Sequence, residues 1–201
     1  FGDLDAVRAA VDENTVAILV EPIQGEGGIH IASADFLKGL RAICDEHRLL
    51  LMFDEVQCGL GRTGDWCGWH SITREVEPDA VSWAKGIANG FPLGAFWISN
   101  RALDERGPLC DLLGAGSHGT TYGGNPVACA AGMKLLEIIE RDGLLESTRT
   151  LGAHLAARLR AMGSPLVVGA LGATDFSEGP PPSGVAVGRA DSVGPIYVTS
   201  S

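Results

Sequence analysis

Lysine is scarce in this sequence, which has only three lysines among 201 residues and a net charge of −10. A protein that binds nucleic acid needs clustered Lys and Arg side chains to neutralise phosphates. The acidic balance therefore argues against a nucleic-acid partner. The scarcity also draws attention to each lysine, and Lys85 has the most informative surroundings of the three.

Long apolar runs are missing as well. No uninterrupted run approaches the ~20 residues that a helix across a bilayer needs. The first five residues, FGDLD, lack the basic and apolar regions of a signal peptide, and the sequence does not begin with Met. We therefore expect a cytoplasmic protein without a membrane partner, and a sequence that forms part of a longer protein.

Paired cysteines and clustered histidines are also lacking. The five cysteines are odd in number and none of them forms a C-x-x-C pair. This pattern indicates neither a disulfide framework nor a zinc site, and favours reduced thiols. The five histidines are widely scattered, so no metal site is predicted.

Two short apolar runs, residues 15–20 and 49–53, lie on either side of an amphipathic helix that Ser33 is expected to cap and that ends near His47. Helical spacing predicts its apolar face to be Phe36, Leu37, Leu40, Ile43 and Cys44. Two apolar strands joined by a helix are typical of a parallel sheet with helices on both faces. The sequence therefore predicts an α/β fold with a mostly parallel sheet. The other expected elements are strands at 80–84 and 93–98 and helices at 3–11, 125–141 and 144–162. Asp3 and Asn125 are expected to cap the first two of these helices.

Charged residues follow three of these strands: Glu21, Asp54 with Glu55, and Lys85. Parallel strands bring their carboxyl ends to one edge of the sheet, where ligands bind in open α/β folds. Unpaired charges are costly in such poorly solvated places, so each group is expected to have a partner there. Taken alone, Glu21 fits a structural role better than a functional one.

The surroundings of Lys85 favour a reactive amine. It follows the apolar run 80–84 and precedes GIANGFPLG, a glycine-rich segment that leaves room for a ligand near the backbone. A lysine that is desolvated or close to another cation loses its proton more easily and attacks carbonyl carbons. The alternative is a structural ion pair between Lys85 and Asp54.

The segment SHGTTYGGNP, residues 117–126, combines hydroxyl groups and glycines directly before a predicted helix. Unpaired N–H groups and the dipole at a helix start favour an anion such as a phosphate or a carboxylate. An ordinary capped loop is the alternative.

The run LLLMFDE, residues 49–55, also resembles the magnesium-binding strand of P-loop ATPases. Such an enzyme needs the pattern G-x-x-x-x-G-K-[ST] to hold the phosphates. Lys85 does not fit this pattern, because Ala84 precedes it and Gly86 follows it. An ATPase fragment is therefore only a remote alternative.

Four motifs occur in order along the chain: EPIQGEGG at 21–28, DEVQCGLGRTG at 54–64, PDAVSWAKG at 78–86 and HGTTYGGNP at 118–126. Together they resemble the class III aminotransferases, which depend on pyridoxal 5′-phosphate (PLP), and especially the acetylornithine and ornithine members. The resemblance covers about residues 1–165.

The resemblance implies fold type I of the PLP-dependent transferases. Residues 1–140 would form the C-terminal part of the large PLP-binding domain, and 141–165 would begin the small C-terminal domain. The Gly, Pro and Ser-rich tail, residues 166–201, departs from the family and is expected to be irregular.

The resemblance also implies cofactor-binding roles. Lys85 would form the covalent link to the cofactor aldehyde and later move the substrate proton. Asp54 would pair with the protonated pyridine nitrogen of PLP. Val56 would pack on the ring, Gln57 would reach its phenolic oxygen, and Glu55 would support this group from behind.

Other roles implied by the family concern the substrate and a second subunit. Thr121 would hold the phosphate of the neighbouring subunit's cofactor, which implies a homodimer with a shared active site. Thr120 would lie near the substrate. Glu26 would pair with an arginine that lies beyond this sequence and move as substrates alternate.

The activity implied is a transaminase of arginine biosynthesis that moves an amino group from N-acetylornithine, or a related ω-amine, to 2-oxoglutarate. The motifs resemble acetylornithine members more than those for ornithine, succinylornithine or 4-aminobutyrate. The alternative is a catalytically dead, truncated fragment with at most a role in dimerisation.

Overall fold

The computed structural model describes residues 1–112, 116–117 and 119–161. The tail 166–201, the predicted end of the last helix at Met162 and the last four residues of the segment 141–165 lie outside the described residues. His118 of the fourth motif lies outside them too.

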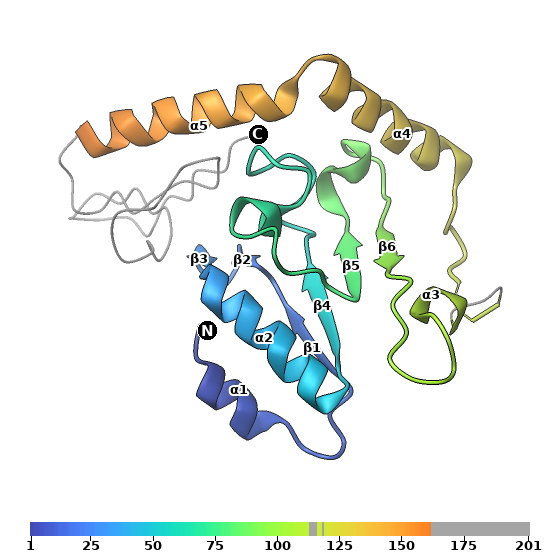
Figure 1. Ribbon diagram of the computed structural model, residues 1–201. Helices are drawn as coiled ribbons and strands as arrows, with labels where there is room; N and C mark the ends of the chain where they lie inside the picture. The colour runs from blue at the N-terminus through green and yellow to red at the C-terminus, as the bar shows by residue number, and fades with distance from the viewer. Residues whose placement is uncertain (113–115, 118, 162–201) are drawn as a thin grey trace.

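The sheet confirms the predicted mostly parallel α/β architecture. Its strand order is β1-β4-β5-β6, with β1 parallel to β4, β4 parallel to β5, and β6 antiparallel to β5 (Figure 1). All four predicted strands are present, with bounds that differ by one or two residues. They are β1 (Ala17–Val20), β4 (Leu50–Asp54), β5 (Ala80–Trp83) and β6 (Ala95–Ile98).

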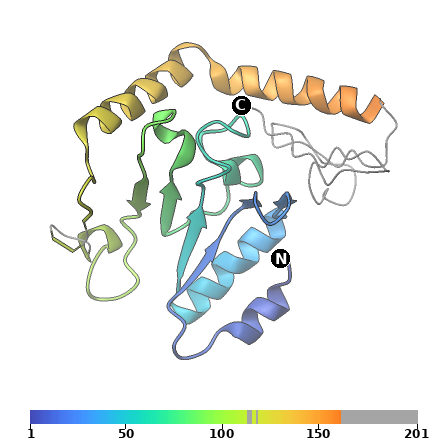
Figure 2. The same cartoon turned by 180° about the vertical axis from the view of Figure 1, so that it is seen from behind.

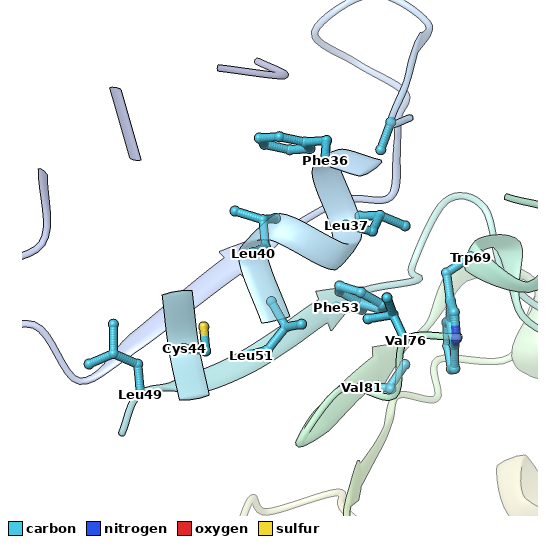
Figure 3. Close-up of a cluster of buried hydrophobic side chains, with 11 residues drawn as sticks. Phe36, Leu37, Leu40, Cys44, Leu49, Leu51, Phe53, Trp69, Val76 and Val81 are labelled. Carbon is cyan, nitrogen blue, oxygen red and sulfur yellow. The ribbon is translucent and has the colours of Figure 1, made fainter. Parts of the chain in front are cut away.

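Helix α2 (Ala34–His47) supplies most of the core beside the sheet. The Ser33 side chain accepts a hydrogen bond of 3.1 Å from the Phe36 N–H, so the predicted cap is confirmed. Figure 3 shows the apolar side of α2 facing β4. The buried residues of α2 are the five expected from helical spacing: Phe36, Leu37, Leu40, Ile43 and Cys44.

Only one face of the sheet is well covered in the described part of the chain. Leu51 and Phe53 of β4 are fully buried against α2. Side chains alternate along a strand, so Leu19 and Phe96 point to the opposite face. They are 64% and 50% exposed. Helices were expected on both faces of the sheet. Within the described residues, only the face that packs against α2 is well covered.

Shorter elements surround this core. Helix α1 (Leu4–Ala10) begins at Asp3, whose side chain accepts from the Asp5 and Ala6 N–H groups, and it lies beside α2. Strands β2 (Ile23–Gln24) and β3 (His30–Ile31) form an antiparallel hairpin. The remaining short elements are η1 (Gly68–Ser71), η2 (Lys85–Ala88) and α3 (Leu109–Leu112).

Helices α4 (Pro126–Arg141) and α5 (Leu144–Ala161) follow each other past the carboxyl ends of β4 and β5 (Figures 1 and 2). The Asn125 side chain caps α4, as predicted. Helix α4 packs against η2. A Cβ atom on Gly132 would lie 3.1 Å from the Ile87 carbonyl oxygen, so glycine allows this close approach.

A buried carboxylate fixes the opposite end of the strands. Asp79, which is 1% exposed, accepts hydrogen bonds of 2.8 Å from the Leu51 N–H and from Arg41, and one of 3.2 Å from Arg101. Asp45 also lies near both arginines, at 2.9 and 2.5 Å. This network ties α2, β4 and the chain after β6 to the start of β5.

Replacing Asp79 with alanine is expected to lower the free energy of unfolding by about 3 kcal/mol, because two arginines and a buried N–H would lose their partner. Asp79→Asn should cost less, since its amide oxygen can still accept from Leu51. Urea unfolding of the natural protein that carries this sequence measures both. The matched control is Asp45→Asn, which is half exposed and should cost at most about 1 kcal/mol. Equal losses at both positions would contradict this assignment.

Candidate active site

Asp54 ends β4 on the less covered face of the sheet. Its carboxylate accepts a hydrogen bond of 2.9 Å from the Val56 N–H, which turns the chain immediately after the strand. Asp54 is the register partner of Ser82 on β5. The carboxylate therefore lies beside the strand that leads, three residues later, to Lys85.

Lys85 begins η2 just after β5 and has a left-handed backbone, with φ of 48°. This conformation is unusual for a residue other than glycine and costs about 1 kcal/mol. Its ammonium group donates a hydrogen bond to the side-chain oxygen of Gln57. Strained backbone of this kind is often found where a side chain has to be presented for chemistry.

Gln57 connects Lys85 with the β2–β3 hairpin. It is half-buried and lies against Gly25, where a Cβ atom would come within 2.6 Å of the Gln57 Cγ. The Gly25 N–H in turn donates to the Glu21 carboxylate over 3.1 Å. Two of the charged residues expected at one edge of the sheet, Lys85 and Glu21, are thus linked through Gln57 and Gly25.

Glu55 lies on the other side of the strand from Asp54 and is 1% exposed. Its carboxylate accepts hydrogen bonds from the Gly68 N–H at 2.6 Å and the Trp69 N–H at 3.0 Å, and from the Cys58 thiol at 3.4 Å. Desolvation raises the pKa of the Glu55 carboxyl, although these hydrogen bonds act against the shift. Its contacts anchor η1 to the end of β4.

Three other predicted residues lie on the surface, as Lys85 itself does. Thr120 and Thr121 precede α4 and are exposed. In the described part of the chain, no hydrogen bond or ion pair joins them to Lys85, Gln57 or Asp54. Glu26 follows Gly25 and is exposed. The structure therefore joins Gln57 to Lys85, with Asp54 at the end of the adjacent strand, and leaves Thr120, Thr121 and Glu26 on the surface.

Comparison with known proteins is consistent with this arrangement. The sequence matches the family described as aminotransferase class-III over residues 2–179. The chain belongs to the class III aminotransferase family. Members of this family depend on PLP, and the match runs through every residue of the sites described above.

Curated relatives include an acetylornithine aminotransferase from Myxococcus xanthus, which is 48% identical over 169 residues and aligns with 84% of this chain. Another, from Rhodobacter capsulatus, is 52% identical over 167 residues, or 81% of this chain. The alignments cover 40% and 39% of those two proteins. The chain thus spans about two fifths of the length of these relatives.

Solved structures share the fold. An acetylornithine aminotransferase from Elizabethkingia anophelis is 31% identical with a TM-score of 0.71, covering 84% of this chain and 41% of that one. An ornithine aminotransferase from Toxoplasma gondii, described as having partial occupancy of PLP at its active site, is 33% identical with a TM-score of 0.71. It covers 83% of this chain and 38% of that one. These similarities confirm the predicted fold type I architecture.

Sequence analysis missed three features of the site. The first is the contact between Gly25 and Gln57, and the second is the bonding of Glu55 to Gly68 and Trp69. The third is the left-handed backbone of Lys85. The glycines of EPIQGEGG are typical of a loop, but nothing in the sequence indicates which side chain lies beside Gly25.

The strain at Lys85 predicts an unusual order of stabilities. Lys85→Gly should have a free energy of unfolding about 1 kcal/mol higher than Lys85→Ala, because glycine tolerates the left-handed backbone. The matched control is Lys134 in the middle of α4, where Gly should be less stable than Ala by about 1 kcal/mol. Chemical denaturation of the four variants measures both differences. The same sign at the two positions would contradict the assignment.

The raised pKa of Glu55 predicts a pH-dependent stability difference. The folded protein holds the Glu55 proton more tightly than the unfolded chain does. The stabilisation that this proton gives is fully present below pH 4.5 and is lost as the pH rises through the raised pKa. The stability of the wild type relative to Glu55→Gln should therefore fall as the pH is raised from below 4.5 to neutral. Denaturation of both proteins across this range tests the sign, and a difference that grows with pH would be contrary to it.

Proposed function

We propose that this chain forms the cofactor-binding part of a PLP-dependent transaminase. The observation that carries the proposal is the meeting of Lys85 and Gln57 beside Asp54, at the carboxyl ends of two adjacent parallel strands. Family membership supports the same conclusion. The chemistry would come from the cofactor, which accepts electrons from the substrate carbon when its ring nitrogen is protonated.

The residues present fit this cofactor. Lys85 offers an amine for the aldehyde and can later carry a proton to and from the substrate carbon. Asp54 offers an anion for the protonated ring nitrogen, and Gln57 an amide for the phenolic oxygen. Val56 lies between these two residues and would border the ring. Glu55 would act from the other side of the strand by holding the backbone of η1.

The names of the relatives support N-acetylornithine as the amino donor. We propose 2-oxoglutarate as the acceptor and arginine biosynthesis in the cytoplasm as the setting. Thr120 and Glu26 would contact the substrate. Both are exposed, so a further segment of the protein or the substrate would have access to them.

A homodimer is part of this proposal, with Thr121 binding the cofactor phosphate of the second subunit. Two observations support it. Thr121 is exposed and, like Thr120, has no hydrogen bond to Lys85, Gln57 or Asp54 among the described residues. Three large apolar side chains at and after this loop are also exposed: Tyr122 at 83%, Val127 at 60% and Met133 at 74%.

Covalent attachment of PLP tests the proposal directly. The natural protein that carries this sequence should bind PLP, and borohydride reduction should add the cofactor mass to the peptide that contains Lys85. Lys85→Ala should lose this label, whereas Lys134→Ala should keep it. Asp54→Asn should keep the label but lower transamination roughly a hundredfold, since breaking such an ion pair costs about 3 kcal/mol. A protein labelled elsewhere, or not at all, would exclude the function.

The alternative is a non-catalytic piece that at most assembles through a dimer surface. The 201 residues alone would then show neither PLP attachment at Lys85 nor amino transfer. Genomic sequence on both sides distinguishes the two: a continuous reading frame that encodes the rest of the family's length favours the enzyme.

A further inference from the structure

Gln57 lies in the turn after β4 and packs against the turn of the β2–β3 hairpin. The side chain of Glu21, directly after β1, accepts a hydrogen bond of 3.1 Å from the Gly25 N–H. The Gly28 N–H closes the turn by donating to the Gly25 carbonyl over 3.2 Å. Glu21 and this turn therefore fix where the Gly25 Cα lies.

Gly25 packs closely against the Gln57 side chain. It is buried, and a Cβ atom there would lie 2.6 Å from the Gln57 Cγ and 3.0 Å from its Cδ. The backbone of Gly25 does not have the positive φ that requires glycine, in contrast to Gly28 with φ of 99°. Glycine is thus needed at position 25 for space beside Gln57 and not for its backbone conformation.

The amide that Gly25 confines is the one that accepts a hydrogen bond from the Lys85 ammonium. A methyl group at position 25 would force Gln57 into another rotamer, because Cγ lies too near its own backbone to move independently. We propose that Glu21 and Gly25 are positioning residues that hold the Gln57 amide against Lys85. Neither touches Lys85; both act through Gln57.

This inference deepens the proposed function, since the Gln57 amide and the Lys85 amine are the groups proposed to meet PLP. It also assigns a role to Glu21. The Glu21 carboxylate would hold the hairpin turn in place, and through it the Gln57 side chain.

A double-mutant cycle in the cofactor-free protein tests the inference independently of PLP. The readout is acetylation of Lys85, quantified by mass spectrometry relative to Lys38 and Lys134 in the same molecules. Gly25→Ala and Gln57→Ala should each raise Lys85 acetylation about threefold, because the amine loses its hydrogen-bond acceptor. In the double variant the two effects should not add, since Gln57→Ala removes the side chain that the Gly25→Ala methyl group would otherwise displace.

Gly27→Ala is the matched control. A Cβ atom there meets nothing within 4 Å and the backbone has no positive φ, so Lys85 acetylation should stay at the wild-type level. Additive effects of Gly25→Ala and Gln57→Ala would overturn the inference. If Gly25→Ala does not fold, adding Gln57→Ala should restore folding. Failure of both the single and the double variant to fold would also overturn the inference.

Glu21 is tested by rescue. Glu21→Leu should raise Lys85 acetylation as Gly25→Ala does, whereas Glu21→Gln retains an oxygen for the Gly25 N–H and should stay close to wild type. Glu13→Leu, in the exposed loop before β1, controls for replacing a carboxylate near that strand. Equal effects of Glu21→Leu and Glu21→Gln would remove Glu21 from the proposal.

The same variants in the PLP-loaded protein separate this inference from the proposed function. Gly25→Ala should weaken PLP binding and shift the absorbance maximum of the bound cofactor, as Gln57→Ala does, without loss of the Lys85 label. If PLP attaches normally but the effects of Gly25→Ala and Gln57→Ala on Lys85 acetylation add, only the positioning role of Gly25 is overturned. A non-additive cycle without attachment would support the positioning role and overturn the PLP function.

Discussion

The parallel pairing of β4 with β5 is the constraint on which the rest of this structure depends. Its register places Asp54 opposite Ser82 and so brings the segment after β4 beside Lys85. Asp79 secures that register from the opposite end, since it binds the Leu51 N–H as well as two arginines. A buried carboxylate far from the chemistry thus determines which residues can meet at the carboxyl edge.

Asp54 and Glu55, two adjacent carboxylates at the end of β4, differ in burial and in bonding partners because they face opposite sides of the sheet. Asp54 lies on the less covered face, where a cationic ligand can approach it. Glu55 is buried and saturated by the Gly68 and Trp69 N–H groups. The alternation of side chains along a strand therefore separates a residue available for binding from one that holds the backbone. The sequence pair Asp-Glu alone does not reveal this difference.

Local patterns predicted the local structure well. The caps at Asp3, Ser33 and Asn125 and the buried side of α2 follow from short-range chemistry and helical period, and all were confirmed. The grouping of strand ends at one edge was also predictable, because parallel strands leave few alternatives. Contacts between loops were not: Gly25 lies 32 residues before Gln57, and no period relates them. Coverage of the second face could not be predicted either, because two apolar strands look alike whether one face or both faces are buried.

The close approach of Gly132 to Ile87 sets the spacing between η2, which begins at Lys85, and α4, which begins just after the threonine loop. A larger side chain at position 132 would therefore push η2, and the Lys85 that begins it, away from the helix that follows the threonine loop.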